Sequence, residues 1–203
     1  MHLRFPAIVC ALRPHGEAGG VAHVFSEDHG LVAGYVPGAR GRQLRPVLIP
    51  GNGIDCELRA RADSQLPTLR TELTASRAPW LGEPMPAAAI GWVTALTAAA
   101  MPDRQPHPPL FGALEAVLDA ICLAPSARGW LAVLVGFEVL LLRELGHGRQ
   151  SSGAALPEPA DFSANLALFD RLAGPLARYA LAHRRSDVMA ARAMLRERLG
   201  RIV

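Results

Sequence analysis

Short apolar runs separated by turn residues dominate the first 80 residues of the chain. Glycine, proline, asparagine and aspartate interrupt these runs. Residues 54–61 alternate between apolar and polar side chains, which is the pattern of a half-buried strand. Short strands at such close spacing are typical of a small antiparallel barrel or sandwich. The pattern predicts strands at residues 5–12, 21–25, 31–36, 47–49, 54–61 and 66–73.

A helical pattern replaces the strand pattern after Pro79, with apolar side chains recurring every three or four residues. The pattern predicts helices at residues 87–101, 110–123, 126–145, 160–183 and 187–199. Ser126 is the expected N-cap of the third helix, and Gly146 is its expected left-handed C-terminal residue. The sequence therefore predicts an α+β multidomain protein, with a β-barrel domain in residues 1–80 followed by an α-helical bundle domain in residues 81–203.

The most apolar run, residues 130–142, is too short for a membrane span, which needs about 20 apolar residues. It also contains Glu138, so a buried core helix is expected there. The first residues lack the long apolar stretch of a secretory signal. The three cysteines form no C-x-x-C pair, which suits a reducing compartment. These features predict a soluble, cytoplasmic protein without a membrane partner.

All 21 cationic side chains are arginine, and the formal net charge is +3. The absence of lysine excludes phosphate loops and Schiff-base chemistry that depend on it. No nucleophile, zinc-protease or paired-carboxylate motif is present, so a hydrolase or oxidoreductase is disfavoured. The histidines and acids of residues 15–29 fall on a predicted strand and in turns, which favours solvated residues over a metal site. We expect no enzyme activity, no cofactor and no bound metal.

Arg40, Arg42 and Arg45 lie in a glycine-containing segment between two predicted strands. No acidic residue occurs between Asp28 and Asp55. A basic loop on a small barrel can bind a phosphate backbone, because guanidinium groups match phosphate oxygens in pairs. An ordinary solvated loop explains the same composition equally well.

A second group of arginines lies on and beside the last predicted helix, and the group consists of Arg184, Arg185, Arg192, Arg196, Arg198 and Arg201. A solvated helix face is the favoured interpretation, because cations also suit a helix C-terminus. Phosphate contact is the alternative. Aromatic side chains that could stack on bases are few in the barrel half: Phe5, Phe25 and Tyr35, of which Phe25 fits the core better.

Short motifs lie at residues 7–17, 24–32 and 38–40 in the first half of the chain, and at residues 137–148 in the second. Taken together, these segments resemble the RecO family of bacterial recombination-repair mediators. The resemblance covers roughly residues 1–148 in order, and it resumes at residues 186–199. It implies an N-terminal OB-fold and a C-terminal helical domain.

The resemblance also implies a function and a set of partners. Family members bind single- and double-stranded DNA, anneal strands, and act with RecR and RecF to load RecA onto strands coated by single-strand-binding protein. They contact the acidic tail of that protein and are not enzymes. On this basis Arg40, Arg42 and Arg45 are the expected DNA contacts, with Arg13 in the matched Arg-Pro pair as a further one. A nucleoid-associated location in the cytoplasm follows.

One departure from the family concerns metal. Many members carry a cysteine-bearing zinc module after the Leu-Gly-x-Gly segment, whereas this chain has no cysteine after Cys122 and looks shorter than is usual. Zinc binding is therefore not expected. A degenerate member that serves as a protein-interaction scaffold, with DNA binding lost or secondary, is the alternative function.

Overall fold

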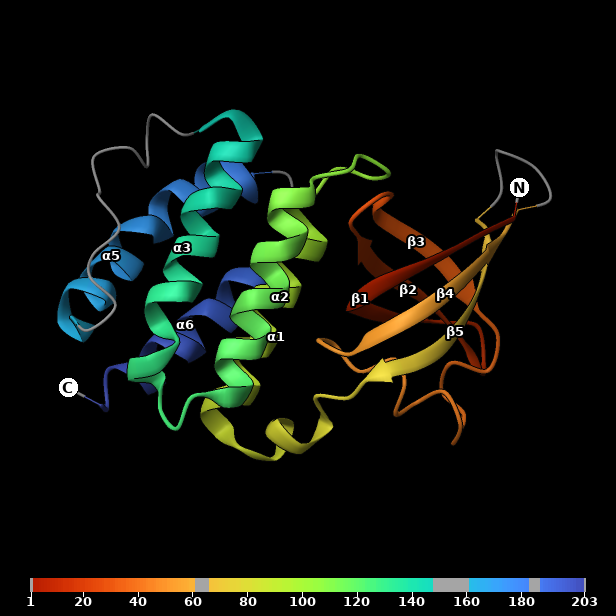
Figure 1. Ribbon diagram of the computed structural model, residues 1–203, viewed down its shortest axis with the longest axis horizontal. Helices are drawn as coiled ribbons and strands as arrows, with labels where there is room; N and C mark the ends of the chain where they lie inside the picture. The colour runs from red at the N-terminus through yellow and green to blue at the C-terminus, as the bar shows by residue number, and fades with distance from the viewer. Residues whose placement is uncertain (1, 61–65, 148–160, 183–186, 203) are drawn as a thin grey trace. The chain divides into compact units, whose positions relative to one another are not determined.

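The first part of the chain forms a five-stranded barrel (Figure 1). The computed structural model describes residues 2–60, 66–147, 161–182 and 187–202. The strand order is β1-β2-β3-β5-β4, and β4 pairs back on β1. The β3–β5 pairing is parallel and the others are antiparallel, an OB-like arrangement. The strands are β1 (His2–His15), β2 (Gly19–Ser26), β3 (Gly30–Val36), β4 (Gly53–Arg59) and β5 (Thr68–Ala75).

Strand β1 is long enough to serve two neighbours. Its first half pairs with β4, its second half pairs with β2, and Ile8 takes part in both pairings. The register shifts between Val9 and Ala11, and a bulge of this kind bends a strand so that a sheet can curve into a barrel. Inward-pointing side chains fill the interior, among them Val9, Val24, Val32, Ile54 and Leu69.

The strand predicted at residues 47–49 is wrong, because these residues form turns in the loop between β3 and β4. The N–H groups of Val47 and Leu48 both donate to the carbonyl of Leu44, at 3.1 and 3.0 Å. The backbone therefore bonds locally instead of joining a ladder. Leu48 is buried in the barrel core, which explains why an apolar run occurs in a loop. The other five predicted strands are confirmed, with shifted ends.

The second part of the chain is helical, which confirms the predicted fold class. Contacts divide the chain into Met1–Gly82 with Met101–Pro108, and Glu83–Ala100 with Pro109–Val203. The boundary drawn at residue 80 stays a prediction. Within the described ranges, no helix combines the length and apolarity needed to cross a membrane. The helices are α1 (Pro84–Ala100), α2 (Pro108–Leu123), α3 (Leu131–Leu142), α5 (Phe162–Pro175) and α6 (Asp187–Leu199).

Helix α3 begins later than the sequence predicts. Ser126 precedes a short 3₁₀ turn, Ala127–Gly129, and its side chain makes no capping hydrogen bond. The α-helix starts only at Leu131, so the predicted cap is wrong. At the other end, Gly146 has a φ of 83°, which confirms its expected left-handed conformation.

Helix α3 lies in the core of the helical unit and carries one charged residue there, Glu138, which is fully buried. Its carboxylate accepts a hydrogen bond from the indole of Trp92 at 2.8 Å. Arg192 of α6 donates from Nε and Nη2 to the same carboxylate, at 3.1 and 2.8 Å. The solvated position expected for Arg192 is therefore wrong: its side chain is buried and paired with the apolar helix.

Candidate nucleic-acid interface

Three side chains form a row across the outer face of the barrel, close to the β1–β2 turn. Arg13 of β1 pairs with Val21 of β2, and Val21 pairs with Tyr35 of β3. Directly paired residues on neighbouring antiparallel strands project to the same side of a sheet. Arg13 is exposed, whereas Val21 and Tyr35 are half-buried. The row therefore presents a cation and an aromatic ring on one surface.

The loop between β3 and β4, residues 37–52, is fastened to the same turn. The backbone N–H of Arg40 donates to the carbonyl of Ala18 at 3.2 Å. The guanidinium Nη1 of Arg40 donates to the carbonyl of Glu17 at 3.1 Å. An arginine has five N–H donors, so this contact leaves others for a ligand. The structure thus brings Arg40 to the hairpin that carries Arg13.

Arg42 and Arg45 are both exposed and lie further along the loop. Gly38 has a φ of 66°, a conformation that glycine adopts without steric cost. The N–H of Gly41 donates to the carbonyl of Gly38 at 2.8 Å, and the N–H of Arg45 donates to the carbonyl of Gly41 at 2.9 Å. The loop is therefore a run of turns that project their arginines outward. Within the described residues, no ion pair joins a carboxylate to Arg42 or Arg45. The same holds for Arg13 and Arg40.

Asn52 anchors the far end of the loop and is fully buried. Its Nδ2 group donates to the carbonyls of Pro46 and Val47, at 2.9 and 3.1 Å. Its Oδ1 atom accepts the N–H of Arg77 at 2.8 Å, and its backbone carbonyl accepts the N–H of Val9 at 2.9 Å. Sequence reasoning missed this residue, because an asparagine between glycines looks like an ordinary turn. It joins the loop, β1 and the segment after β5.

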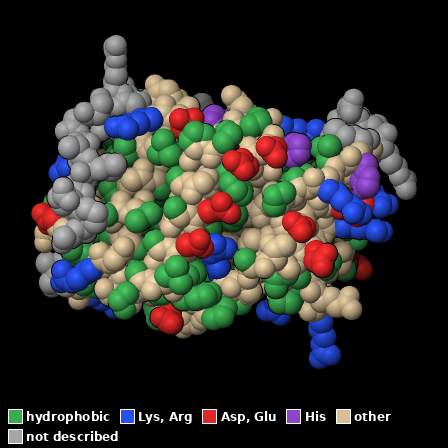
Figure 2. Space-filling model, viewed as in Figure 1, with side chains coloured by type: hydrophobic (Ala, Val, Ile, Leu, Met, Phe, Trp, Pro, Cys, Tyr) green, Lys and Arg blue, Asp and Glu red, His purple; other side chains and the backbone are tan. Residues whose placement is uncertain are grey.

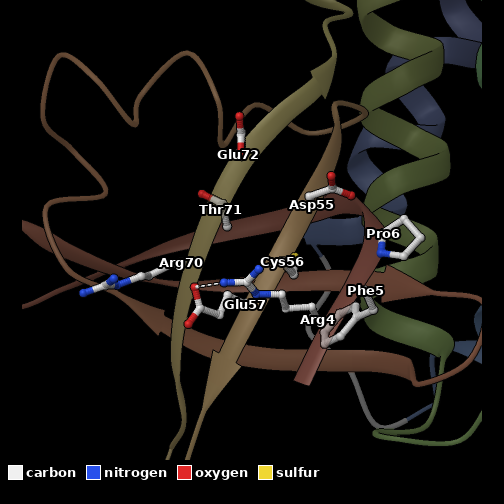
Figure 3. A pocket seen from close by; sticks show the side chains of 9 residues that line it. All are labelled: Arg4, Phe5, Pro6, Asp55, Cys56, Glu57, Arg70, Thr71 and Glu72. Carbon is white, nitrogen blue, oxygen red and sulfur yellow. Dashed lines mark ion pairs between the residues drawn. The ribbon is translucent and has the colours of Figure 1, made fainter. Parts of the chain in front are cut away.

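A second charged surface covers β1, β4 and β5, and its charges neutralise one another. Glu57 is hydrogen-bonded to His2 at 2.7 Å and forms ion pairs with Arg4 at 3.7 Å and with Arg59 at 2.5 Å. Figure 3 shows the guanidinium of Arg4 reaching this carboxylate from the neighbouring strand. Hydrogen bonds from Arg59 and His2 lower the pKa of the Glu57 carboxyl below its ordinary value.

This second surface also forms a pocket of about 500 Å³. Side chains of both signs line it, and acidic and basic groups lie together over the barrel in Figure 2. Such a lining attracts a polyanion less than a surface of one sign does. The charged residues that line the pocket are Arg4, Asp55, Glu57, Arg70 and Glu72.

The histidines and cysteines of the barrel are not assembled into a reactive site. The ring of His15 contacts Tyr35, whereas that of His29 contacts Phe5 near the β2–β3 turn. Among the described residues, no group of three or more His, Cys, Asp or Glu could hold a metal ion. Burial raises the pKa of the Cys10 and Cys56 thiols to about 12, so they stay protonated at neutral pH.

Comparisons with known proteins identify the same two regions. The family model described as "Recombination protein O N terminal" matches residues 1–77, and that described as "Recombination protein O C terminal" matches residues 86–196. The chain is 41% identical to the DNA repair protein RecO of Rhodospirillum centenum over 143 residues, which are 70% of this chain and 56% of the relative. It is 38% identical to the protein of that name from Paracoccus denitrificans over 150 residues, 74% of this chain and 61% of the relative.

The matched region spans about three fifths of the length of these relatives. The two family models together cover most of the chain in the expected order. The resemblance predicted from the sequence is confirmed, and the chain belongs to the RecO family.

Proposed function

We propose that the protein is a DNA repair and recombination mediator that binds single- and double-stranded DNA through the arginine end of its barrel. The observation that carries this proposal is the set of four exposed arginines on one hairpin and one loop. Within the described residues, no ion pair joins a carboxylate to any of them. The four are Arg13, Arg40, Arg42 and Arg45.

Unpaired arginines on a barrel surface suit a phosphate backbone for two physical reasons. Each guanidinium can donate two parallel hydrogen bonds to phosphate oxygens. Each neutralised phosphate also releases condensed counterions, which favours binding at low salt. A protein that lowers the repulsion between two strands in this way can anneal them. No step of this activity requires a nucleophile, a metal or a cofactor.

The proposed partners come from the family. They are RecR, with RecF as a further one, and the acidic tail of single-strand-binding protein, together with RecA as the protein that is loaded. The names of the relatives, "DNA repair protein RecO", support the repair role. A nucleoid-associated, cytoplasmic location belongs to the same proposal.

A protein-interaction scaffold is the second candidate function. The helical unit exposes large apolar side chains, notably Leu123 at 81% and Met194 at 56%. Exposed apolar side chains can serve a protein partner where they lie together in one patch. Size-exclusion chromatography with light scattering on mixtures with RecR or the acidic tail peptide tests this function. Binding of the peptide by a chain that does not bind DNA supports the scaffold.

The test of DNA binding compares two triple variants that lose the same charge. Arg40, Arg42 and Arg45 are replaced with alanine in one variant, and Arg4, Arg59 and Arg70 in the control. A labelled single-stranded oligonucleotide is titrated with each variant at several salt concentrations, and fluorescence anisotropy reports the binding. The loop variant should reduce the slope of log K against log salt by about two, since each lost phosphate contact removes about 0.7 for a single strand. Equal losses in the two variants contradict the loop assignment.

A further inference from the structure

We propose that Tyr35 is a base-stacking platform that makes the arginine end of the barrel favour single-stranded over duplex DNA. This inference rests on the proposed function, because it assigns a role to a neighbour of the proposed phosphate contacts. It concerns the kind of strand that is bound, which the arginines alone do not determine.

The aromatic ring of Tyr35 lies directly against the backbone of Gly19. A Cβ atom added to Gly19 would lie 2.4 Å from the hydroxyl oxygen of Tyr35 and 2.5 Å from its Cε2 atom. Real Cβ atoms do not come so close to other atoms, so a larger residue at position 19 would force the ring of Tyr35 to shift from this place. Gly19 therefore acts as a positioning residue that lets the ring lie across the start of β2.

The ring of Tyr35 is also braced from the side by His15. The two ring centroids are 5.8 Å apart and the ring planes cross at 77°, an edge-to-face contact. Three elements therefore fix the ring: its own strand β3, the glycine of β2 and the histidine at the end of β1. A ring held in this way loses little conformational freedom when a ligand stacks on it.

The position of Tyr35 separates it from the other aromatic residues considered for stacking. Phe5 and Phe25 are buried in the barrel, with 4% and 0% of their surface exposed. Tyr35 is half-buried and lies on the outer face in the row that contains Arg13. Strands are spaced about 4.8 Å apart, so two strand spacings place these residues about 10 Å apart. A nucleotide on the ring could therefore place a nearby phosphate close to Arg13.

Stacking on a protein ring distinguishes the two forms of DNA. The faces of paired bases are covered by neighbouring pairs inside a duplex, whereas an unpaired strand can offer a base to an aromatic ring. Arginine–phosphate contacts are available from both forms. Tyr35 should therefore add to the affinity for single strands and add little to the affinity for duplexes.

The test measures dissociation constants for a single strand and for its duplex at fixed salt. Tyr35→Leu removes the ring but keeps an apolar side chain, and Tyr35→Phe is the matched control that keeps the ring. We expect Tyr35→Leu to weaken single-strand binding by about 5- to 150-fold, the range for one stacked base. Duplex binding should change less than twofold, and Tyr35→Phe should match the parent for both ligands.

An unchanged ratio of the two affinities in Tyr35→Leu overturns the inference, whether both are unchanged or both fall. It does not overturn DNA binding, which fails only if the parent binds neither form. If Tyr35→Leu does not fold, photocross-linking of the parent chain to single strands that carry 5-iodouracil replaces it. A cross-link at Tyr35 supports the inference. Cross-links confined to other residues in the bound complex overturn it.

Discussion

The arginines of the barrel loop and those of α6 have opposite surroundings. Arg42 and Arg45 are exposed, and no ion pair joins them to a carboxylate in the part of the chain that the structure describes. At the end of the chain, Arg192 pairs with Glu138, Arg196 with Asp170 and Arg201 with Glu197. Both groups are basic clusters in the sequence, so the spacing of arginines along the chain does not distinguish a free surface from a paired one.

The distant carboxylates explain this difference. Glu138 belongs to α3 and Asp170 to α5, and both are brought to α6 by helix packing. Burial raises the pKa of the Glu138 carboxyl, and the adjacent guanidinium of Arg192 opposes that rise. The arginine also lies over the ring of Phe169, with 3.7 Å from its central carbon to the ring centroid. Arg192 therefore stabilises the packing of the helical unit, whereas the guanidinium groups of Arg42 and Arg45 form no ion pair within the described ranges.

Breaking the buried pair should give the largest effect. Arg192→Ala leaves the Glu138 carboxylate buried without its charge partner, and we expect a loss of about 3–5 kcal/mol in the free energy of unfolding. Urea unfolding followed by Trp fluorescence measures it. Arg201→Ala is the matched control, because its pair with Glu197 is exposed and should contribute less than about 1 kcal/mol.

A double variant, Glu138→Leu with Arg192→Met, sharpens this prediction. Apolar side chains of similar volume avoid the cost of burying charge, so the double variant should recover part of the stability that Arg192→Ala loses. The recovery is reduced by the Trp92 indole N–H, which loses its acceptor in Glu138→Leu. Equal losses in Arg192→Ala and Arg201→Ala would show that the pair does not stabilise the helical unit. DNA binding should follow the folded fraction only.

Asn52→Ala tests what holds the loop arginines in place. It leaves the N–H of Arg77 and the carbonyls of Pro46 and Val47 without their side-chain partner, and we expect a loss of about 1–3 kcal/mol. The affinity for DNA should also fall at concentrations of urea that leave the barrel folded. Gln43→Ala, at an exposed amide of the same loop, is the control and should change stability by less than about 0.5 kcal/mol.

Much of the fold could be predicted because its pattern is local. Residues 54–61 alternate in hydrophobicity, and β4 occupies most of that range. Residues 130–142 are apolar except for Glu138, and most of α3 is buried, with Val133 as its exposed side chain. The strand predicted at residues 47–49 failed because burial of Leu48, and not strand pairing, is the reason for the apolar run. Hydrophobicity reports burial, and it identifies a strand only when the backbone joins a ladder.

The candidate site could be predicted only in part. A glycine-rich loop with arginines is visible in the sequence, and the structure attaches it to the β1–β2 turn through Arg40. The buried pair of Arg192 with Glu138 was not visible, because the two residues are 54 positions apart. The contact between Tyr35 and Gly19 was missed for the same reason, since it depends on the register of two strands.

A carboxylate introduced at Gln43 would give the loop arginines an acidic neighbour, as the arginines of α6 have. Gln43→Glu places a carboxylate between Arg42 and Arg45, where it can compete with phosphate for their guanidinium groups. The position is exposed, so the free energy of unfolding should change by less than about 0.5 kcal/mol. Affinity for an oligonucleotide should fall by about two- to fivefold at low salt, measured by anisotropy, because one added charge is partly screened by solvent.

Gln43→Ala separates loss of the amide from gain of the charge, and its affinity should match that of the parent. The difference between the glutamate and alanine variants should shrink as salt rises, because salt screens exposed charges. Equal affinities for the two variants at low salt would mean that phosphates do not approach Arg42 and Arg45. Arg13 and Arg40, which both lie close to the β1–β2 turn, would then be the remaining proposed DNA contacts.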